Sequence, residues 1–157
     1  MTSPELREWP SSDRRYRRSE VSAVVGSGDA VWQRAAGDVL RWRVKTASGF
    51  AVDPLRPVSQ GDRVAVTARV LGVTVIEPVE VVTVVQEHDR VGFAYRTMPG
   101  HPVSGEEAFI VHRQGDEIRL TIRSLTRAAP QQPWRALYPA LRIAQKIVRR
   151  RYLRALR

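Results

Sequence analysis

The side chains best suited to acid–base chemistry lie close together in the chain, in the stretch from Tyr95 to Glu107. His101 stands there in a Pro-Gly-His-Pro sequence, and Glu106 and Glu107 follow it. An imidazole oriented by a carboxylate can move protons near neutral pH, and a tyrosine hydroxyl can donate a hydrogen bond to an oxyanion. We therefore predict a candidate catalytic set of Tyr95, His101, Glu106 and Glu107.

The same stretch also has a structural interpretation. A Pro-Gly-His-Pro sequence is typical of a shaped turn, in which Gly100 takes an unusual φ and His101 caps backbone groups. Glu106 and Glu107 would then anchor the loop through backbone amides or a nearby arginine. The residues alone leave the two interpretations open.

Other catalytic chemistries find little support in the sequence. The three histidines, at positions 88, 101 and 112, fall in different expected loops and strands, and the chain contains no cysteine, so we expect no metal site. Gly26-Ser27-Gly28 lacks the third glycine of a dinucleotide loop and the Gly-Lys-Ser/Thr of a phosphate loop. No Gly-x-Ser-x-Gly sequence marks a nucleophilic serine. We expect no cofactor.

The net charge of +10 is concentrated at the end of the chain. Residues 118–157 contain 11 Lys or Arg and no Asp or Glu, whereas the other 117 residues contain 15 basic and 16 acidic side chains. Arg149, Arg150 and Arg154 therefore form a candidate contact for an anionic membrane or a phosphate backbone. A solvated helix face explains the same charges equally well. Aromatic residues are not interleaved with basic ones along any expected strand, so we predict no dedicated nucleic-acid readout.

The positions of the candidate residues depend on the secondary structure that the hydrophobic pattern predicts. A strand is expected over residues 18–25, and a helix from Asp29, as its N-cap, to about residues 41–44. Strands are then expected over residues 63–70, 79–86, 91–97, 106–113 and 117–127. From Pro133 onward, apolar residues recur at helical spacing with basic residues on the opposite side. This pattern indicates a long amphipathic helix that Pro139 either starts or kinks.

This order of elements predicts an α+β fold. Strict alternation, as in Arg63–Val70, is typical of an antiparallel sheet with one face exposed to water. Because only one long helix is available to cover the other face, the sheet must wrap around it, which is the helix-grip arrangement of START-like proteins. We expect a single domain over residues 18–157, preceded by a flexible arm over residues 1–17. The lack of cysteine and of a signal-peptide pattern favours a cytoplasmic protein.

The segment from Gly92 to Pro102 reads Gly-Phe-Ala-Tyr-Arg-Thr-Met-Pro-Gly-His-Pro, and the segment Gly105–Phe109 reads Gly-Glu-Glu-Ala-Phe. Together with Arg-Arg-Tyr-Leu at residues 150–153, these segments resemble those of uncharacterised protein family 0548, a domain of unknown function. The resemblance extends from about Tyr16 to the end of the chain. It implies a helix-grip-like fold and leaves the activity open, because a fold does not define a function.

A sheet wrapped around a helix encloses a cavity, so we predict a domain that binds a hydrophobic or amphipathic small molecule. The candidate ligand-binding residues are Trp32, Trp42, Tyr95, Arg96, His101 and Tyr152. Two alternatives stay open: an acid–base enzyme, such as a cyclase, dehydratase or hydrolase, and an adaptor for anionic surfaces. The oligomeric state is not predicted.

Overall fold

The computed structural model describes residues 1–10 and 14–157. The strands are β1 (Arg17–Ser27), β2 (Ala51–Asp53), β3 (Arg63–Val70), β4 (Val73–Gln86), β5 (Arg90–Thr97), β6 (Val103–Gln114) and β7 (Glu117–Ala128). The helices are α1 (Asp29–Val39), α2 (Arg43–Thr46) and α3 (Trp134–Tyr152). Within the described residues, no helix is long and apolar enough to cross a membrane.

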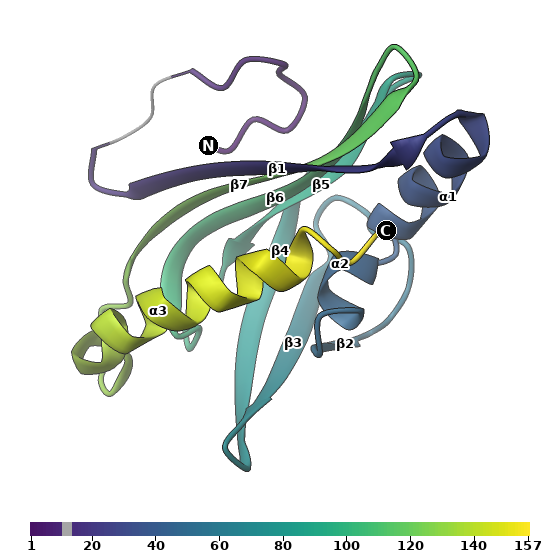
Figure 1. Cartoon of the computed structure of the whole chain (residues 1–157). Helices are drawn as coiled ribbons and strands as arrows, with labels where there is room; N and C mark the ends of the chain where they lie inside the picture. The colour runs from purple at the N-terminus through teal and green to yellow at the C-terminus, as the bar shows by residue number, and fades with distance from the viewer. Residues whose placement is uncertain (11–13) are drawn as a thin grey trace.

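The strands form one antiparallel sheet in the order β1-β7-β6-β5-β4-β3-β2, so β1 and β2 lie at its edges. The sheet is strongly curved, and α3 crosses its concave face (Figure 1). The short helices α1 and α2 lie together near the C-terminus (Figure 1). The predicted α+β fold of the helix-grip, START-like type is confirmed, because one curved antiparallel sheet wraps around α3, and α1 and α2 cover the rest of its apolar face.

Local differences from the expected elements have identifiable causes. α1 ends at Val39, and Trp42, in a left-handed conformation with φ 62°, turns the chain into α2. Gly28, with φ 90°, precedes α1, whereas the predicted N-cap Asp29 is the first helical residue. Pro139 lies inside α3, where it removes one backbone hydrogen bond without ending the helix.

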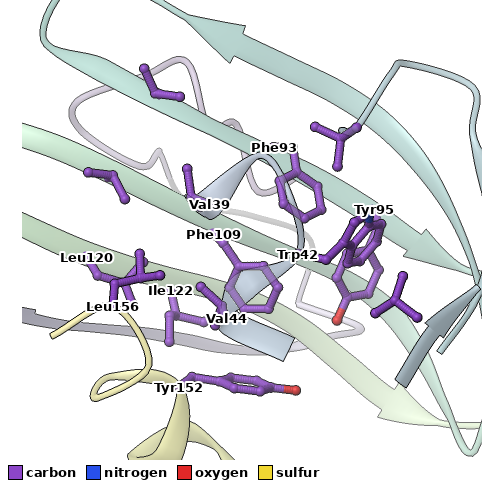
Figure 2. Packing of buried hydrophobic residues seen from close by; sticks show 14 of the residues in the cluster. Val39, Trp42, Val44, Phe93, Tyr95, Phe109, Leu120, Ile122, Tyr152 and Leu156 are labelled. Carbon is purple, nitrogen blue, oxygen red and sulfur yellow. The ribbon is translucent and has the colours of Figure 1, made fainter. Parts of the chain in front are cut away.

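Aromatic rings from several elements form the centre of the core (Figure 2). The ring of Phe93 lies edge-on to Trp42, with 4.7 Å between centroids, and edge-on to Phe109 at 5.8 Å. Phe109 also contacts Tyr152 of α3 edge-on at 5.3 Å, so the core joins the sheet to the long helix. Such pairs contribute about 0.5–1.5 kcal/mol each beyond the burial of their area.

The alternating pattern predicted that one face of the sheet would be exposed to water, but much of the convex face of β7 is buried. Residues 1–10 lie along this face (Figure 1) and accept hydrogen bonds from its arginines. Arg123, only 2% exposed, donates a 2.7 Å hydrogen bond to the Ser3 carbonyl, and Arg90 donates a 2.5 Å hydrogen bond to the Pro4 carbonyl. The guanidinium groups thus replace water with backbone oxygens of the N-terminal segment.

The arm predicted over residues 1–17 is therefore packed against the sheet in its first part, while its residues 11–13 lie outside the described residues. Trp9 is buried, and the Arg18 guanidinium lies over its ring at 3.9 Å from the centroid. These contacts tie the segment to the start of β1. The flexibility of the arm and the domain boundary near residue 17 stay predictions.

Candidate functional site

A cavity of about 290 Å³ lies between the concave face of the sheet and α3. Apolar side chains from both layers line it, among them Phe50, Val75, Val103, Leu141 and Val148. The polar side chains that face the same space include Lys45, Glu77, Tyr95, His101, Glu107 and Tyr152. Mostly apolar walls with a few converging polar groups are typical of small-molecule sites.

A second hollow, of about 360 Å³, lies on the convex face beside the N-terminal segment. Several of its charged groups already have partners in the chain. The Arg7 guanidinium lies 2.6 Å from an Asp89 carboxylate oxygen, and the Arg123 guanidinium lies 2.5 Å from a Glu20 carboxylate oxygen. We therefore take the inner cavity as the candidate functional site.

Lys45 is the centre of the polar group in the inner cavity. It belongs to α2 and is only 4% exposed. Its Nζ lies 4.7 Å from the ring centroid of Phe50, 5.0 Å from that of Tyr152 and 5.3 Å from that of Tyr95. The face of an aromatic ring attracts a desolvated cation by about 0.5–2 kcal/mol, so these rings offset part of the cost of burying the ammonium group.

Two carboxylates and a hydroxyl complete the surroundings of Lys45. Its Nζ donates a 2.6 Å hydrogen bond to the Tyr152 hydroxyl and lies 3.6 Å from Glu107 Oε1 and 3.9 Å from Glu77 Oε2. The Tyr95 hydroxyl donates a hydrogen bond to the same Glu107 oxygen. Both tyrosine hydroxyls lie at one end of the aromatic cluster (Figure 2). One cation thus holds two carboxylates together in the cavity wall.

Burial changes how this cluster binds protons. Desolvation raises the pKa of Glu77 above its ordinary value of 4.5, while Lys45 lowers that pKa and Glu107 raises it. Desolvation also raises the pKa values of Tyr95 and Tyr152 well above 10, so both hydroxyls stay neutral donors. The cluster therefore combines an ammonium, two hydroxyls and a carboxyl group that titrates closer to neutral pH than a free glutamate.

His101 lines the same cavity, but its environment does not make it the base that the sequence suggested. Its Nδ1 accepts a 3.1 Å hydrogen bond from the Val103 amide, and its Nε2 lies 3.9 Å from Glu77 Oε2. Desolvation, followed by the charge of the nearby ammonium, lowers the pKa of His101 to about 3. The imidazole is thus neutral at pH 7, it caps a backbone group, and the carboxylate beside it is Glu77 rather than the predicted Glu106 or Glu107.

We predict that His101 makes the fold sensitive to acid. Its pKa is about 3 in the folded chain and about 6.5 in the unfolded chain, so between these values the unfolded chain binds more protons. Lowering the pH from 7 to 4 should therefore reduce the free energy of unfolding by about 3 kcal/mol through this residue. His101→Asn keeps an acceptor for the Val103 amide without a titrating ring, so urea unfolding at the two pH values should show a smaller loss.

His88→Asn is the matched control, because the His88 side chain is 92% exposed. Glu77, with its raised pKa, favours the folded state as the pH falls, and His112, with a pKa lowered to about 4, opposes it. The wild type and the His101→Asn variant share the His112 contribution, and Glu77, whose Oε2 lies 3.9 Å from His101 Nε2, is buried in both. An identical pH dependence in these two proteins would contradict the prediction.

Glu106 and Arg96 direct their charged groups to the convex face, away from the cluster. Successive residues of a strand point to opposite faces, so a Glu107 that faces the cavity places the carboxylate of Glu106 outside. One Glu106 oxygen accepts a 2.8 Å hydrogen bond from the Thr2 amide and a second hydrogen bond from the Thr2 hydroxyl. Arg96 forms an ion pair with Glu80 at 2.7 Å. Glu106 nevertheless lines the inner cavity, whereas Arg96 does not. The charged groups of both residues are thus held by partners outside the Lys45 cluster.

The two tryptophans predicted to contact a ligand belong to the core instead. Trp42 is 1% exposed and packs against Phe93, and Trp32 is half-buried against the same core. Neither lines the cavity. Tyr152 and Tyr95, which were predicted with them, do line it.

The three arginines predicted to contact anions do not share one surface. Arg150 and Arg154 are exposed, as a solvated helix face requires. Arg149 lines the cavity, and its Nη2 donates a 3.0 Å hydrogen bond to the Ser124 hydroxyl of β7. The predicted anion-binding face therefore loses Arg149 to the interior.

Sequence reasoning missed Lys45 and Glu77, although both carried a signal. Lys45 is one of only two lysines in a chain with 26 Lys or Arg, so its choice over arginine was unusual. Glu77 interrupts a run of β-branched residues that the structure assigns to the first half of β4, and no strand was predicted there. A single acid in an apolar strand is a candidate for a buried, paired group.

Comparison with known sequences gives two matches over nearly the whole chain. A family model described as a domain of unknown function, DUF1990, matches residues 2–155. A UPF0548 protein of Deinococcus radiodurans is 32% identical over 164 residues, which cover 95% of this chain and 78% of that protein.

Solved structures share the fold at low sequence identity. A hypothetical protein from Helicobacter pylori matches with a TM-score of 0.69 and 14% identity, over 99% of this chain and 96% of that one. The structure of Ara h 8.0201 matches with a TM-score of 0.56 and 11% identity, over 90% of this chain and 97% of that one. At such identities the likeness shows the fold alone.

Proposed function

The chain belongs to the DUF1990 family, and its UPF0548 relative confirms the predicted resemblance to family 0548. On this premise, we propose that it binds a small amphipathic molecule in the cavity between the sheet and α3. The observation that carries the proposal is the composition of the cavity wall. Apolar side chains from the sheet and the helix surround one compact polar cluster, formed by Lys45, Glu77 and Glu107 with two tyrosines.

The polar cluster supports an amphipathic ligand rather than a purely hydrophobic one. An isolated buried ion pair is often no more stable than an apolar pair of the same volume, so the fold has little to gain from burying three charged groups. A ligand with a polar group can use them, since they are already oriented and desolvated. The volume of about 290 Å³ suits a small molecule and is too small for a long folded lipid with two chains.

The proposal predicts that filling the cavity abolishes binding. Val148 lines the cavity from α3, so Val148→Trp should place an indole in the ligand space. N-phenyl-1-naphthylamine, an apolar fluorescent probe, should bind the wild type and lose at least about tenfold in affinity with this variant. The measurement is a fluorescence titration, with thermal unfolding to verify the fold.

Ile147→Trp is the matched control, because Ile147 directly precedes Val148 in α3 and its side chain is 52% exposed. It adds the same indole to the same helix outside the cavity and should leave the affinity unchanged. Equal affinities for the wild type and both variants, or no binding by any of them, would sink the proposal.

An acid–base enzyme on the same cavity is the second candidate. The observation that favours it is the raised pKa of Glu77 beside Lys45, since a carboxyl group that titrates closer to neutral pH can act as an acid or a base. A panel of aryl esters, epoxides and β-hydroxy ketones tests this candidate. Turnover that disappears in Glu77→Gln at unchanged probe affinity would support an enzyme, and no turnover above buffer with any substrate would exclude these reactions.

We also propose a contact with an anionic surface and a cytoplasmic location. Contact with an anionic membrane or nucleic acid now depends on Arg150 and Arg154, because Arg149 faces the cavity. A cytoplasmic location rests on the lack of cysteine in the sequence.

A further inference from the structure

We propose that the ligand is an amphipathic acid whose carboxylate, sulfonate or phosphate is bound by Arg149 inside the cavity. This inference rests on the proposed function, because it names the chemical class of the molecule that the same cavity would hold. The observation behind it is one unpaired nitrogen of the Arg149 side chain.

Arg149 carries an unsatisfied hydrogen-bond donor. Its Nε is buried, and among the described residues it is the one buried side-chain nitrogen or oxygen without a hydrogen-bond partner. Leaving such a group unpaired costs about 1–3 kcal/mol or more when the group is charged, so native structures rarely tolerate it without a reason. A missing partner that occupies the cavity would supply that reason.

The surroundings of Arg149 leave its charge available to a ligand. The Nη2 group donates to the Ser124 hydroxyl at 3.0 Å, and in the described part of the chain no carboxylate oxygen lies within 4.0 Å of the guanidinium. Lys45 is different, because Glu107, Glu77 and the Tyr152 hydroxyl already surround its ammonium. Of the two cations that line the cavity, Arg149 is thus the one able to accept a new anionic partner.

The guanidinium is also held in position. Arg149 lies on α3 three residues before Tyr152, whose ring is buried in the aromatic core, and Ser124 fixes one of its nitrogens against β7. Thr126 and Gln145 line the cavity with Arg149, so further polar groups are available to the oxygens of an acid. Paired N–H groups of a fixed guanidinium match the two oxygens of a carboxylate or sulfonate.

The carboxylates of the cavity do not prevent the binding of an anion. Glu106 also lines the cavity, but its carboxylate is held by Thr2, and Lys45 and Arg149 balance Glu77 and Glu107 in formal charge. Because desolvation raises the pKa of Glu77, that carboxyl group can take up a proton when an acid enters. The negative charge of the ligand then replaces that of Glu77, and no carboxylate in the cavity is left without a partner.

Two fluorescent probes with the same aromatic body test this inference. 1-Anilinonaphthalene-8-sulfonate carries an acid, and N-phenyl-1-naphthylamine lacks it. Arg149→Met, which keeps an unbranched apolar chain but removes the guanidinium, should weaken the sulfonate probe about 10- to 100-fold and change the neutral probe less than about twofold. Arg149→Lys keeps the charge and loses Nε–H, so it should give an intermediate loss of the sulfonate probe.

Arg150→Gln is the control, since Arg150 is exposed on the same helix and its loss removes the same charge. Val148→Trp should weaken both probes, which verifies that they occupy the cavity. If both probes bind there but the Arg149 variants affect them equally or not at all, the inference is wrong and the proposed function stands. If neither probe responds to Val148→Trp, the proposed function itself fails.

Discussion

Replacing Lys45 with methionine is expected to lower the free energy of unfolding by about 3–5 kcal/mol at pH 7. The ammonium is 4% exposed and lies within 3.9 Å of oxygens from both Glu77 and Glu107. Methionine fills a similar volume but leaves two carboxylates facing each other in an apolar wall. Urea unfolding followed by tryptophan fluorescence measures the loss.

Lys146→Met is the matched control for this variant, because Lys146 is the other lysine of the chain and is exposed on α3. Its loss should change the free energy of unfolding by less than about 0.5 kcal/mol. Adding Glu77→Gln to Lys45→Met removes one of the orphaned carboxylates and should recover at least about 1 kcal/mol. A loss below about 1 kcal/mol for Lys45→Met, with no recovery in the double variant, would mean that the cluster is solvated rather than buried.

The loss in free energy of unfolding caused by Lys45→Met should also be smaller in acid. The pKa of Glu77 is raised by burial already in the presence of Lys45, and removing the cation raises it further. A carboxyl group with a raised folded-state pKa favours the folded state below 4.5 and loses that contribution as the pH rises through the raised pKa. The difference between the variant and the wild type should therefore be smaller at pH 5 than at pH 7.

Gly105→Ala is expected to lower the free energy of unfolding by about 3 kcal/mol or more, because the chain has no room for a methyl group there. A Cβ at this position would lie 1.7 Å from the Leu125 carbonyl oxygen and 2.8 Å from the Leu125 carbonyl carbon. The backbone of Gly105 also has φ 150°, a conformation that residues with a side chain rarely adopt. Its amide donates a 2.9 Å hydrogen bond to the Thr97 hydroxyl, so the strand cannot simply move away.

Gly72→Ala separates the steric clash at Gly105 from the cost of its positive φ. Gly72 has φ 79° in the turn between β3 and β4, and a Cβ there would meet no atom within 4 Å. It should cost about 1–2 kcal/mol, the price of the backbone conformation alone. Equal losses for the two variants in urea unfolding would mean that the close approach to Leu125 does not matter.

Several features of this protein follow from local patterns. The hydrophobic pattern predicts the strands that became β5, β6 and β7. The register of β5 and β6, which places Tyr95 opposite Glu107, is seen only in the structure. The apolar stripe of the last helix includes Tyr152, which is 2% exposed, but Leu137 of the same stripe is 46% exposed, so burial is concentrated at the C-terminal end of the helix. With one long helix for a whole sheet, the fold class follows as well.

The sequence did not predict the partners of the candidate residues. Lys45 and Tyr152 are 107 positions apart and share a hydrogen bond, and Thr2 and Glu106 are 104 positions apart. No local periodicity relates such pairs, because their contact depends on how far the sheet curves. The N-terminal segment, which looked like a polar arm, similarly lies on the convex face because arginines and Glu106 of that face bind its backbone.

The sequence by itself thus determined the family, most of the strands and the amphipathic last helix, because these follow from patterns along the chain. Strand β2 and the first half of β4 were not predicted. The tertiary structure alone decided which of these side chains act together. Curvature of the sheet brings Lys45 between Glu77 and Glu107, leaves the Arg149 Nε without a partner and lowers the pKa of His101. Desolvation and charge pairing act through space, so the chemistry of the Tyr95–Glu107 stretch became defined only when residues from α2, β4 and α3 closed around it.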